Sequence, residues 1–581
     1  MNPSAPIHEQ EIYDILIRVI TAKQLTDSTP SEITKILTTA FSNRAKSINA
    51  WVSKHLMVGI NLNVGCDFGR KIDPGPHPKS KEAAAFREFW GEKSTLRRFA
   101  DGSLLESLEW DKDPIYELTL YALQKHFSDD VKIEFAPRDI SSIFAIKGHV
   151  SKEQDPIPVY DELVGILRSL NLTVGITSVS PISPFLRNTA VFPYEQMNAK
   201  SGHVSLAPHS IKILAKLETS KAWPIELTPL LQFKIAVYIK IAKLLNEKKV
   251  TAKPHYEGVQ IFFHGFVFEL EAFHGDELKQ FAGSKHGEKV YYKDKILVVH
   301  HSYISALCSR YSSFSEAIRA AVRWVRAKCV TAEALPQEAI EIMMAYVYTS
   351  GKTPTNSYSG FLRFLKLLAS KNRVICINEM TPASDTLDLP ITVVASHCPH
   401  SDFTRNPLLT KSVVQFLHLA AIQSLKFALE NQYIPLERNL PRIYATPTNH
   451  WKVKFFIDTT VLPHNEYNIM LPKRKTGKFE IKTKVPPEFK DLYIDFNPVL
   501  SMLKELNIRF GSILNFWYDE FGGIAIGVSY SDELLNSKPL KEENLQFSML
   551  NEAGDVSTDI ESIKQQIITM GTGIIKSFQV V

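Results

Sequence analysis

Cysteine is scarce in this sequence, and no two cysteines stand close together. The 581 residues include five of them, at Cys66, Cys308, Cys329, Cys376 and Cys398. None forms a CxxC pair, and their number is odd. We therefore expect reduced thiols rather than a disulfide framework or a zinc site.

Long hydrophobic runs are absent as well. No stretch of about 18 apolar residues is uninterrupted, the length that a membrane-spanning helix needs. The N-terminus, Met-Asn-Pro-Ser-Ala-Pro, has no basic region followed by an apolar run, as a signal peptide would. The sequence thus predicts a soluble intracellular protein without a membrane partner.

The chain also lacks a strong excess of charge of one sign. Its 67 basic and 62 acidic residues give a formal net charge of +5. This small excess excludes a histone-like protein, and any nucleic-acid surface must come from local clustering of basic residues.

Several catalytic signatures are missing. The sequence contains no GxxxxGK[ST] loop and no GxGxxG turn, which hold phosphates through backbone amides. It has no GxSxG turn, the mark of a hydrolase nucleophile. His264, His274, His300 and His301 lie near one another in the chain but not at ligand spacing on one element, so we predict no metal site from them.

What the sequence does contain is a succession of ordinary globular segments. Its length predicts roughly three to four domains, and we place boundaries near residues 125, 290 and 450. Apolar spacing predicts helices over 11–54, 80–90, 159–170, 227–246, 316–329 and 408–429. Strands are predicted over 55–64, 172–179, 211–217, 259–264, 266–273, 391–395, 453–456, 513–518 and 524–528. This pattern indicates a multidomain protein of the α/β and α+β classes.

One acidic pair resembles the metal-binding carboxylates of a polymerase-β-type nucleotidyltransferase. Such an enzyme needs a Gly-Ser turn, two carboxylates at i and i+2 on the next strand, and a third acid from a neighbouring strand. Glu269 and Glu271 have the required spacing on a predicted strand, and Gly258 lies upstream. A solvent-facing pair at a sheet edge is the simpler interpretation of these two glutamates.

Two features around this pair argue against catalysis. Gly258 is followed by Val259 rather than by a serine. The neighbouring predicted strand carries Lys212 and Lys216, which would repel metal ions, where a third acid is needed. The other acidic candidate, Asp111 and Asp113 after Gly102-Ser103, is broken by Pro114 and is better explained as a solvated loop.

Basic residues gather in three places. These candidate RNA-binding groups are Arg319, Arg323 and Arg326 on one helix, Lys93, Arg97 and Arg98, and Lys473, Arg474 and Lys475 in a loop. The arginine row repeats at i, i+4 and i+7 beside the predicted buried stripe of its helix, where it would hold three guanidiniums toward phosphates. A solvated helix face, or packing against a neighbouring domain, explains the same spacing.

Longer strings resemble the nucleolar RNA-associated protein family (Nrap). The strongest is residues 86–103, FREFWGEKSTLRRFADGS, which is similar to the family signature FRxFWGxKxxLRRFxDGS. Further similarity lies in residues 172–187, 318–328, 401–405 and 516–519, in the family's order. Family members are usually longer, and the match begins inside the third of their six domains.

The resemblance implies a fold and a function. The expected domains are a partial poly(A)-polymerase-like domain (1–125), a nucleotidyltransferase-like domain (126–290), a poly(A)-polymerase/OAS-like helical domain (291–450) and a C-terminal α+β domain (451–581). They imply a non-catalytic, RNA-associated scaffold without a cofactor, in the nucleolus of the nucleus. Its implied partners are pre-ribosomal RNA and proteins of the small-subunit processome, and its implied role is small-subunit assembly and pre-rRNA processing. An active template-independent nucleotidyltransferase using Glu269 and Glu271, and a pure protein-interaction module, remain the alternatives.

Overall fold

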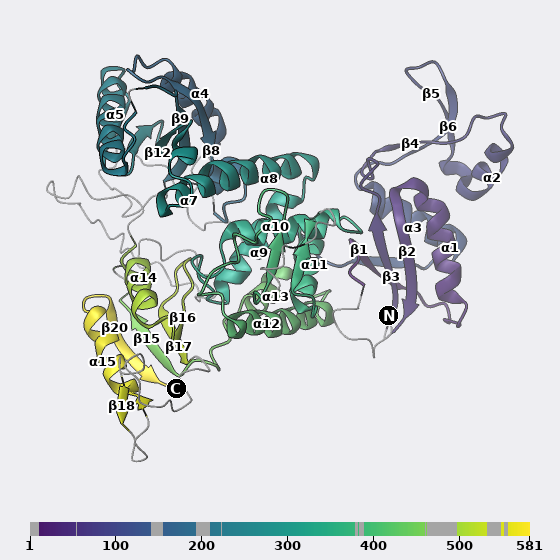
Figure 1. Cartoon of the computed structure of the whole chain (residues 1–581). Helices are drawn as coiled ribbons and strands as arrows, with labels where there is room; N and C mark the ends of the chain where they lie inside the picture. Colours follow the sequence, from purple (N-terminus) through teal and green to yellow (C-terminus); the bar gives the residue numbers. More distant parts are fainter. Residues whose placement is uncertain are drawn as a thin grey trace, which may run out of the picture.

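The chain forms four units that follow one another in the sequence (Figure 1). The computed structural model describes residues 11–53, 55–140, 155–192, 194, 210–221, 223–377, 382, 388–458, 461, 497–530, 548–550 and 556–581. The first, second and fourth units combine helices with strands, and the third is mainly helical. This arrangement confirms the predicted multidomain α/β and α+β class.

The N-terminal unit is an antiparallel sheet with helices on one face. Its strand order is β2 (Ala45–Val52), β3 (Leu56–Leu62), β1 (Ile15–Ile20) and β7 (Lys132–Phe135). The helices α1 (Thr29–Phe41) and α3 (Pro114–His126) pack on it.

The helices predicted over 11–54 are wrong at both ends of that range, where strands β1 and β2 lie before and after α1. Ile17 and Val19 face the helices, whereas Leu16 packs with Met57 on the opposite face. Burial of both faces breaks the alternation of apolar and polar residues that marks a half-buried strand, so the spacing resembled a helix.

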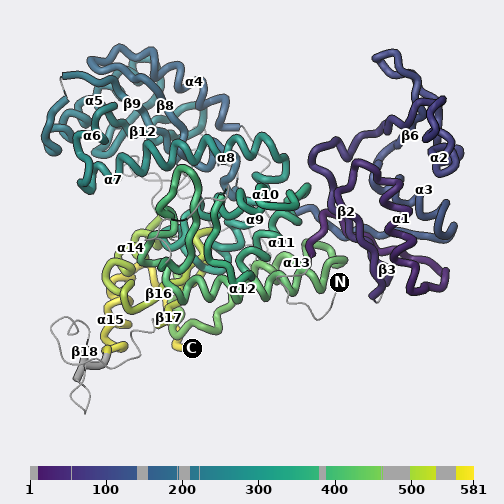
Figure 2. The backbone as a smooth tube through the Cα atoms, turned by 45° about the vertical axis from the view of Figure 1, so that its right-hand side comes forward, coloured from purple at the N-terminus to yellow at the C-terminus, as the bar shows by residue number. Residues whose placement is uncertain are grey.

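A three-stranded arm projects from the N-terminal unit (Figures 1 and 2). Its strand order is β4 (Ile72–Pro74), β6 (Leu104–Glu109) and β5 (Thr95–Arg98). The helix α2 (Lys81–Trp90) follows Ser80 as predicted and leads through a short 3-10 turn, η3 (Gly91–Lys93), into β5. All four residues of β5 are exposed, so the arm presents its outer strand to solvent.

The second unit is built on a five-stranded sheet. Its order is β10 (Thr251–Pro254), β11 (Val259–Phe263), β12 (Phe266–His274), β9 (Ile211–Leu217) and β8 (Ile176–Pro181). β12 and β9 run parallel, and the other neighbours are antiparallel. The helices α4 (Pro156–Arg168) and α5 (Leu227–Glu247) share one apolar core with the sheet, as their predicted apolar spacing indicated.

The central unit is a helical bundle. Its main helices are α8 (Val298–Arg310), α9 (Phe314–Ala327), α10 (Gln337–Thr349), α11 (Ser357–Ala369), α12 (Lys411–Glu430) and α13 (Leu436–Ile443), and a short sheet pairs β13 (Val374–Cys376) with β14 (Thr392–Val394). By length and composition alone α12 is apolar enough to cross a membrane. Its buried Leu417, Ala421 and Leu425 belong to the same core as α9, which explains that composition.

The C-terminal unit is a second antiparallel sheet with helices. The strand order is β16 (Leu514–Trp517), β17 (Ala525–Tyr530), β15 (Val453–Ile457) and β20 (Ile575–Val580), with α14 (Pro498–Phe510) and α15 (Ile560–Met570). Between β17 and α15 in the sequence, β18 (Ser548–Leu550) pairs with β19 (Val556–Thr558) in an antiparallel arrangement. The turn between β16 and β17 carries Asp519 and Glu520, which reach into the helical unit.

Candidate functional site

The acidic pair lies at the centre of the second unit. Glu269 and Glu271 are two residues apart on β12, so they point to the same face of the sheet. Lys212 on β9 stands opposite Glu269 in the parallel register. The interpretation of a solvent-facing pair at a sheet edge is wrong, because β12 is the middle strand of five and both glutamates are half-buried.

Side chains of the protein itself hold these carboxylates. His255 contacts Glu269, and Lys293 contacts Glu271. A third carboxylate, Glu257, accepts from the ammonium group of Lys289 at 3.2 Å. The hydrogen bond and the charge of Lys289 lower the pKa of Glu257, which keeps that carboxylate ionised.

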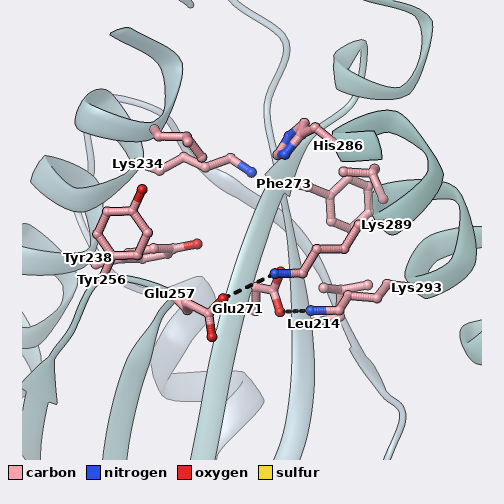
Figure 3. A pocket seen from close by; sticks show the side chains of 12 residues that line it. Leu214, Lys234, Tyr238, Tyr256, Glu257, Glu271, Phe273, His286, Lys289 and Lys293 are labelled. Atoms are coloured by element: carbon pink, nitrogen blue, oxygen red, sulfur yellow. Dashed lines mark hydrogen bonds and ion pairs between the residues drawn. The ribbon is translucent and has the colours of Figure 1, made fainter. Parts of the chain in front are cut away.

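The two lysines come from a segment that joins the sheet unit to the bundle. Lys289 lies on α7 (Lys285–Tyr291), and Lys293 lies on η6 (Tyr292–Leu297), a single stretch of π-helix before α8. Figure 3 shows both side chains reaching toward Glu257 and Glu271 from one side of the pocket. π-Helical turns often mark functional sites, where they set the direction of a side chain.

The pocket between these groups is small and internally neutralised. Its volume is about 160 Å³, with Tyr238 and Tyr256 on the side opposite the lysines (Figure 3). Lys234, deeper in the pocket, donates to Glu277 at 2.5 Å, and His286 contacts the same carboxylate oxygen. Across the described ranges, no three His, Cys, Asp or Glu side chains are arranged to hold a metal ion.

Gly258 has a packing role at this site. A Cβ added there would lie 2.3 Å from the carbonyl oxygen of Leu270, so β11 and β12 approach each other too closely for any side chain. Val259 beside it is fully buried in the apolar core. The close approach explains this glycine without a phosphate-binding turn.

The second acidic candidate is a helix cap. The Asp113 carboxylate accepts from the backbone N–H groups of Ile115 and Tyr116, each at 3.1 Å, at the start of α3. These two hydrogen bonds satisfy backbone amide groups that have no partner inside the helix. The interpretation as a loop segment rather than a metal site therefore agrees with the contacts.

The structure corrects the expectation of an exposed arginine row. α9 is buried on nearly all sides, and Arg323 is inaccessible. Its guanidinium makes two hydrogen bonds to Asp519, at 3.2 and 3.1 Å. Arg326, 2% exposed, pairs with Glu520 at 3.2 Å. Burial raises the pKa of Glu520 and lowers that of Arg326, because desolvation outweighs their attraction.

Arg319, the third member of the row, is half-buried. It donates to the carbonyl of Val191 at 3.2 and 3.1 Å, which ties α9 to the end of the sheet unit. The row therefore connects domains instead of facing solvent. The alternative considered from the sequence, packing against a neighbouring domain, describes Arg323 and Arg326 correctly.

Of the other two basic groups, the structure describes only the one on the projecting arm. Arg97 and Arg98 are exposed on β5, and Arg97 pairs with Glu109 at 3.3 Å. Lys93 is half-buried, with its ammonium group 5.1 Å from the centre of the Trp110 ring. Lys473, Arg474 and Lys475 lie outside the described residues.

A buried charged network that the sequence did not reveal joins the sheet unit to the bundle. Glu341 on α10 is inaccessible and accepts from Arg187 at 3.1 Å and from Thr189 at 2.6 Å. His300 on α8 contacts the same carboxylate at 2.6 Å and His397 at 3.1 Å. Burial alone would raise the pKa of Glu341, but Arg187 and His300 lower it overall. Nothing in the sequence around His300 indicated that Glu341 and His397 would be its partners.

Comparison with known proteins identifies the architecture. Four family models match in chain order: Nrap protein domain 3 (8–128), Nrap protein nucleotidyltransferase domain 4 (141–309), Nrap protein PAP/OAS1-like domain 5 (311–376) and Nrap protein domain 6 (449–578). Among solved structures, "Structure of E. coli MS115-1 CdnC:HORMA-deltaN complex" aligns with a TM-score of 0.33 and 15% identity, over 53% of this chain and 91% of that one.

Curated relatives match most of the chain. Nucleolar protein 6 of Xenopus laevis is 25% identical over 87% of this chain and 50% of its own length. The Mus musculus protein is 23% identical over 92% and 52%, and the Homo sapiens protein is 22% identical over 87% and 50%. The chain thus spans about half the length of these relatives.

These comparisons confirm the expected location, the expected domain types and a nucleolar RNA-associated role. The relatives' name supports the nucleolus of the nucleus as the location. The domain descriptions agree with the predicted nucleotidyltransferase-like and poly(A)-polymerase/OAS-like units, and with a nucleolar RNA-associated role. Because four Nrap domain models match it in consecutive order, this chain belongs to the Nrap family.

Proposed function

We propose that this chain is a non-catalytic, RNA-associated scaffold in small ribosomal subunit assembly and pre-rRNA processing. Its partners are pre-ribosomal RNA and proteins of the small-subunit processome. The observation that carries the non-catalytic part is the pairing of Glu271 with Lys293 and of Glu257 with Lys289. A nucleotidyltransferase needs such carboxylates to bind two divalent cations, and here ammonium groups of the protein neutralise them.

The alternative is a template-independent nucleotidyltransferase that uses Glu269 and Glu271. Its mechanism requires both carboxylates to release His255 and Lys293 and to accept metal ions together with a third acid. Lys212, in register with Glu269 on the next strand, adds a positive charge where that chemistry needs a negative one.

A tailing assay separates the two functions. The chain is incubated with labelled nucleoside triphosphates, magnesium and an RNA primer, with an active poly(A) polymerase as the positive control. We expect no extension. Extension that disappears in the Glu269→Ala, Glu271→Ala variant would establish the enzyme and overturn the scaffold.

The RNA contact is proposed for the projecting arm, where Arg97 and Arg98 are exposed and Lys93 lies at the base of β5. Crosslinking in cells followed by sequencing of the attached RNA is expected to recover pre-ribosomal RNA. Replacing Lys93, Arg97 and Arg98 by glutamine should reduce that recovery. Wild-type recovery from this variant would remove the arm from the RNA contact, and absence of pre-ribosomal RNA from the wild-type sample would contradict RNA association.

A further inference from the structure

Two groups of lysines in the nucleotidyltransferase-like unit differ in their partners. Those that line the pocket are each paired with a glutamate: Lys234, Lys289 and Lys293. Those toward the end of α5, Lys240, Lys243 and Lys249, are exposed, and the structure records no ion pair for them with any described residue. The second group therefore carries charge that no described residue neutralises through an ion pair.

These lysines lie on the second half of α5 and just after its end. Lys240 and Lys243 are three residues apart, so they share a side of α5. Lys249 follows the helix in a left-handed conformation, with φ 63°. From Lys240 to the end of the helix at Glu247, α5 advances about 10 Å at the rise of an α-helix. α5 lies at the outer edge of its unit in Figure 1.

The end of α4 extends this surface. Lys248 donates to the hydroxyl of Ser169 at 2.7 Å, which brings the exposed Arg168 next to the end of α5. Glu247 lies four residues after Lys243 on the same side of α5, so it offsets one of the positive charges there. We call the group Arg168, Lys240, Lys243, Lys248 and Lys249 the α5 lysine face.

We propose that the α5 lysine face binds the phosphate backbone of double-helical RNA. This inference rests on the proposed RNA association and adds a site separate from the pocket and from the arm. A cluster of exposed cations that make no ion pair with any described residue attracts a polyanion and releases its counterions. The exposed residues from 239 to 249 include no aromatic ring, so the face has no platform on which unpaired bases could stack. Phosphate contacts alone favour a duplex, which is recognised by shape.

The test compares two triple variants of the full chain. One carries Lys240→Gln, Lys243→Gln and Lys249→Gln. The matched control carries Lys279→Gln, Lys295→Gln and Lys426→Gln, which removes the same charge from exposed lysines that already have acidic partners. Binding of a labelled RNA duplex of arbitrary sequence is measured against salt concentration, and thermal melting checks that each variant folds.

We expect the face variant to bind the duplex on the order of tenfold or more weakly at low salt, with a salt slope reduced by about 2 to 3 units. The control should keep wild-type affinity, and arginine at the same three positions should retain binding. A face variant with wild-type affinity and slope overturns the site while RNA association stands. A single strand that competes better than the duplex overturns the duplex assignment, and a wild-type chain that binds no RNA overturns the proposed function as well.

Discussion

At the scale of single residues, Gly258 shows how packing replaces an expected catalytic role. Its position against the Leu270 carbonyl leaves no room for a Cβ. We predict that Gly258→Ala lowers the free energy of unfolding by about 1–3 kcal/mol, because the two strands must separate. Gly165 on α4, with nothing within 4 Å of a Cβ, is the matched control. Gly165→Ala should be neutral or stabilising by about 0.5–1 kcal/mol. Equal urea midpoints for the two variants would contradict this packing role.

Lys328 gives a residue-level prediction about pH. Burial lowers the pKa of Lys328 to about 7, and its ammonium group donates to the carbonyls of Ile443 and Ala445. The unfolded chain keeps this proton up to the ordinary lysine value of 10.5. Between these values the unfolded state binds more protons, so the free energy of unfolding rises with pH.

We therefore expect Lys328→Met to remove a stabilisation that the wild type gains between pH 7 and pH 9, about 1–3 kcal/mol. Urea unfolding at the two pH values measures the difference. Lys426→Met, which changes an exposed lysine on α12, is the control and should keep the wild-type pH dependence. An unchanged pH dependence in Lys328→Met would show that Lys328 titrates as an exposed lysine does.

At the scale of elements, α9 is the most buried helix that the sequence singled out. Val322 and Val325 are 1% and 0% exposed and lie in the bundle core. We predict that Val325→Ala costs about 1–3 kcal/mol through the cavity that it leaves. Val322→Asp should be worse, because it buries a carboxylate without a partner. Thermal melting measures both, and an unmoved transition in Val322→Asp would contradict the burial of this face.

Local patterns predicted some elements well and others poorly. The strand 211–217, the hairpin 259–273 and the long helix of α5 follow from periodicity within each segment, and the structure gives nearly the same bounds. The strand β1 was missed because both its faces are buried. The partners of Glu271 and Arg323 were missed because Lys293 and Asp519 lie far along the chain, where no periodic signal connects them.

At the scale of the whole molecule, the Arg323–Asp519 pair couples the helical unit to the C-terminal unit. Removing one member of a buried pair leaves an uncompensated charge, at a cost of about 3–5 kcal/mol. We expect Arg323→Met to lower the urea midpoint and to make the C-terminal unit more sensitive to limited proteolysis. The double variant Arg323→Met, Asp519→Leu should recover much of the loss. A double variant as unstable as the sum of its single variants would show that the two residues act independently.

The same pair has a consequence for how the protein is made. Asp519 leaves the ribosome 196 residues after Arg323. At a synthesis rate of roughly 5–20 residues per second, this interval lasts about 10–40 s. During it α9 carries two guanidiniums destined for burial, and the carboxylates that will neutralise them have not yet been translated. The contacts that join α9 to the C-terminal turn therefore form only after that turn has emerged, and until then Arg323 and Arg326 lack their carboxylate partners.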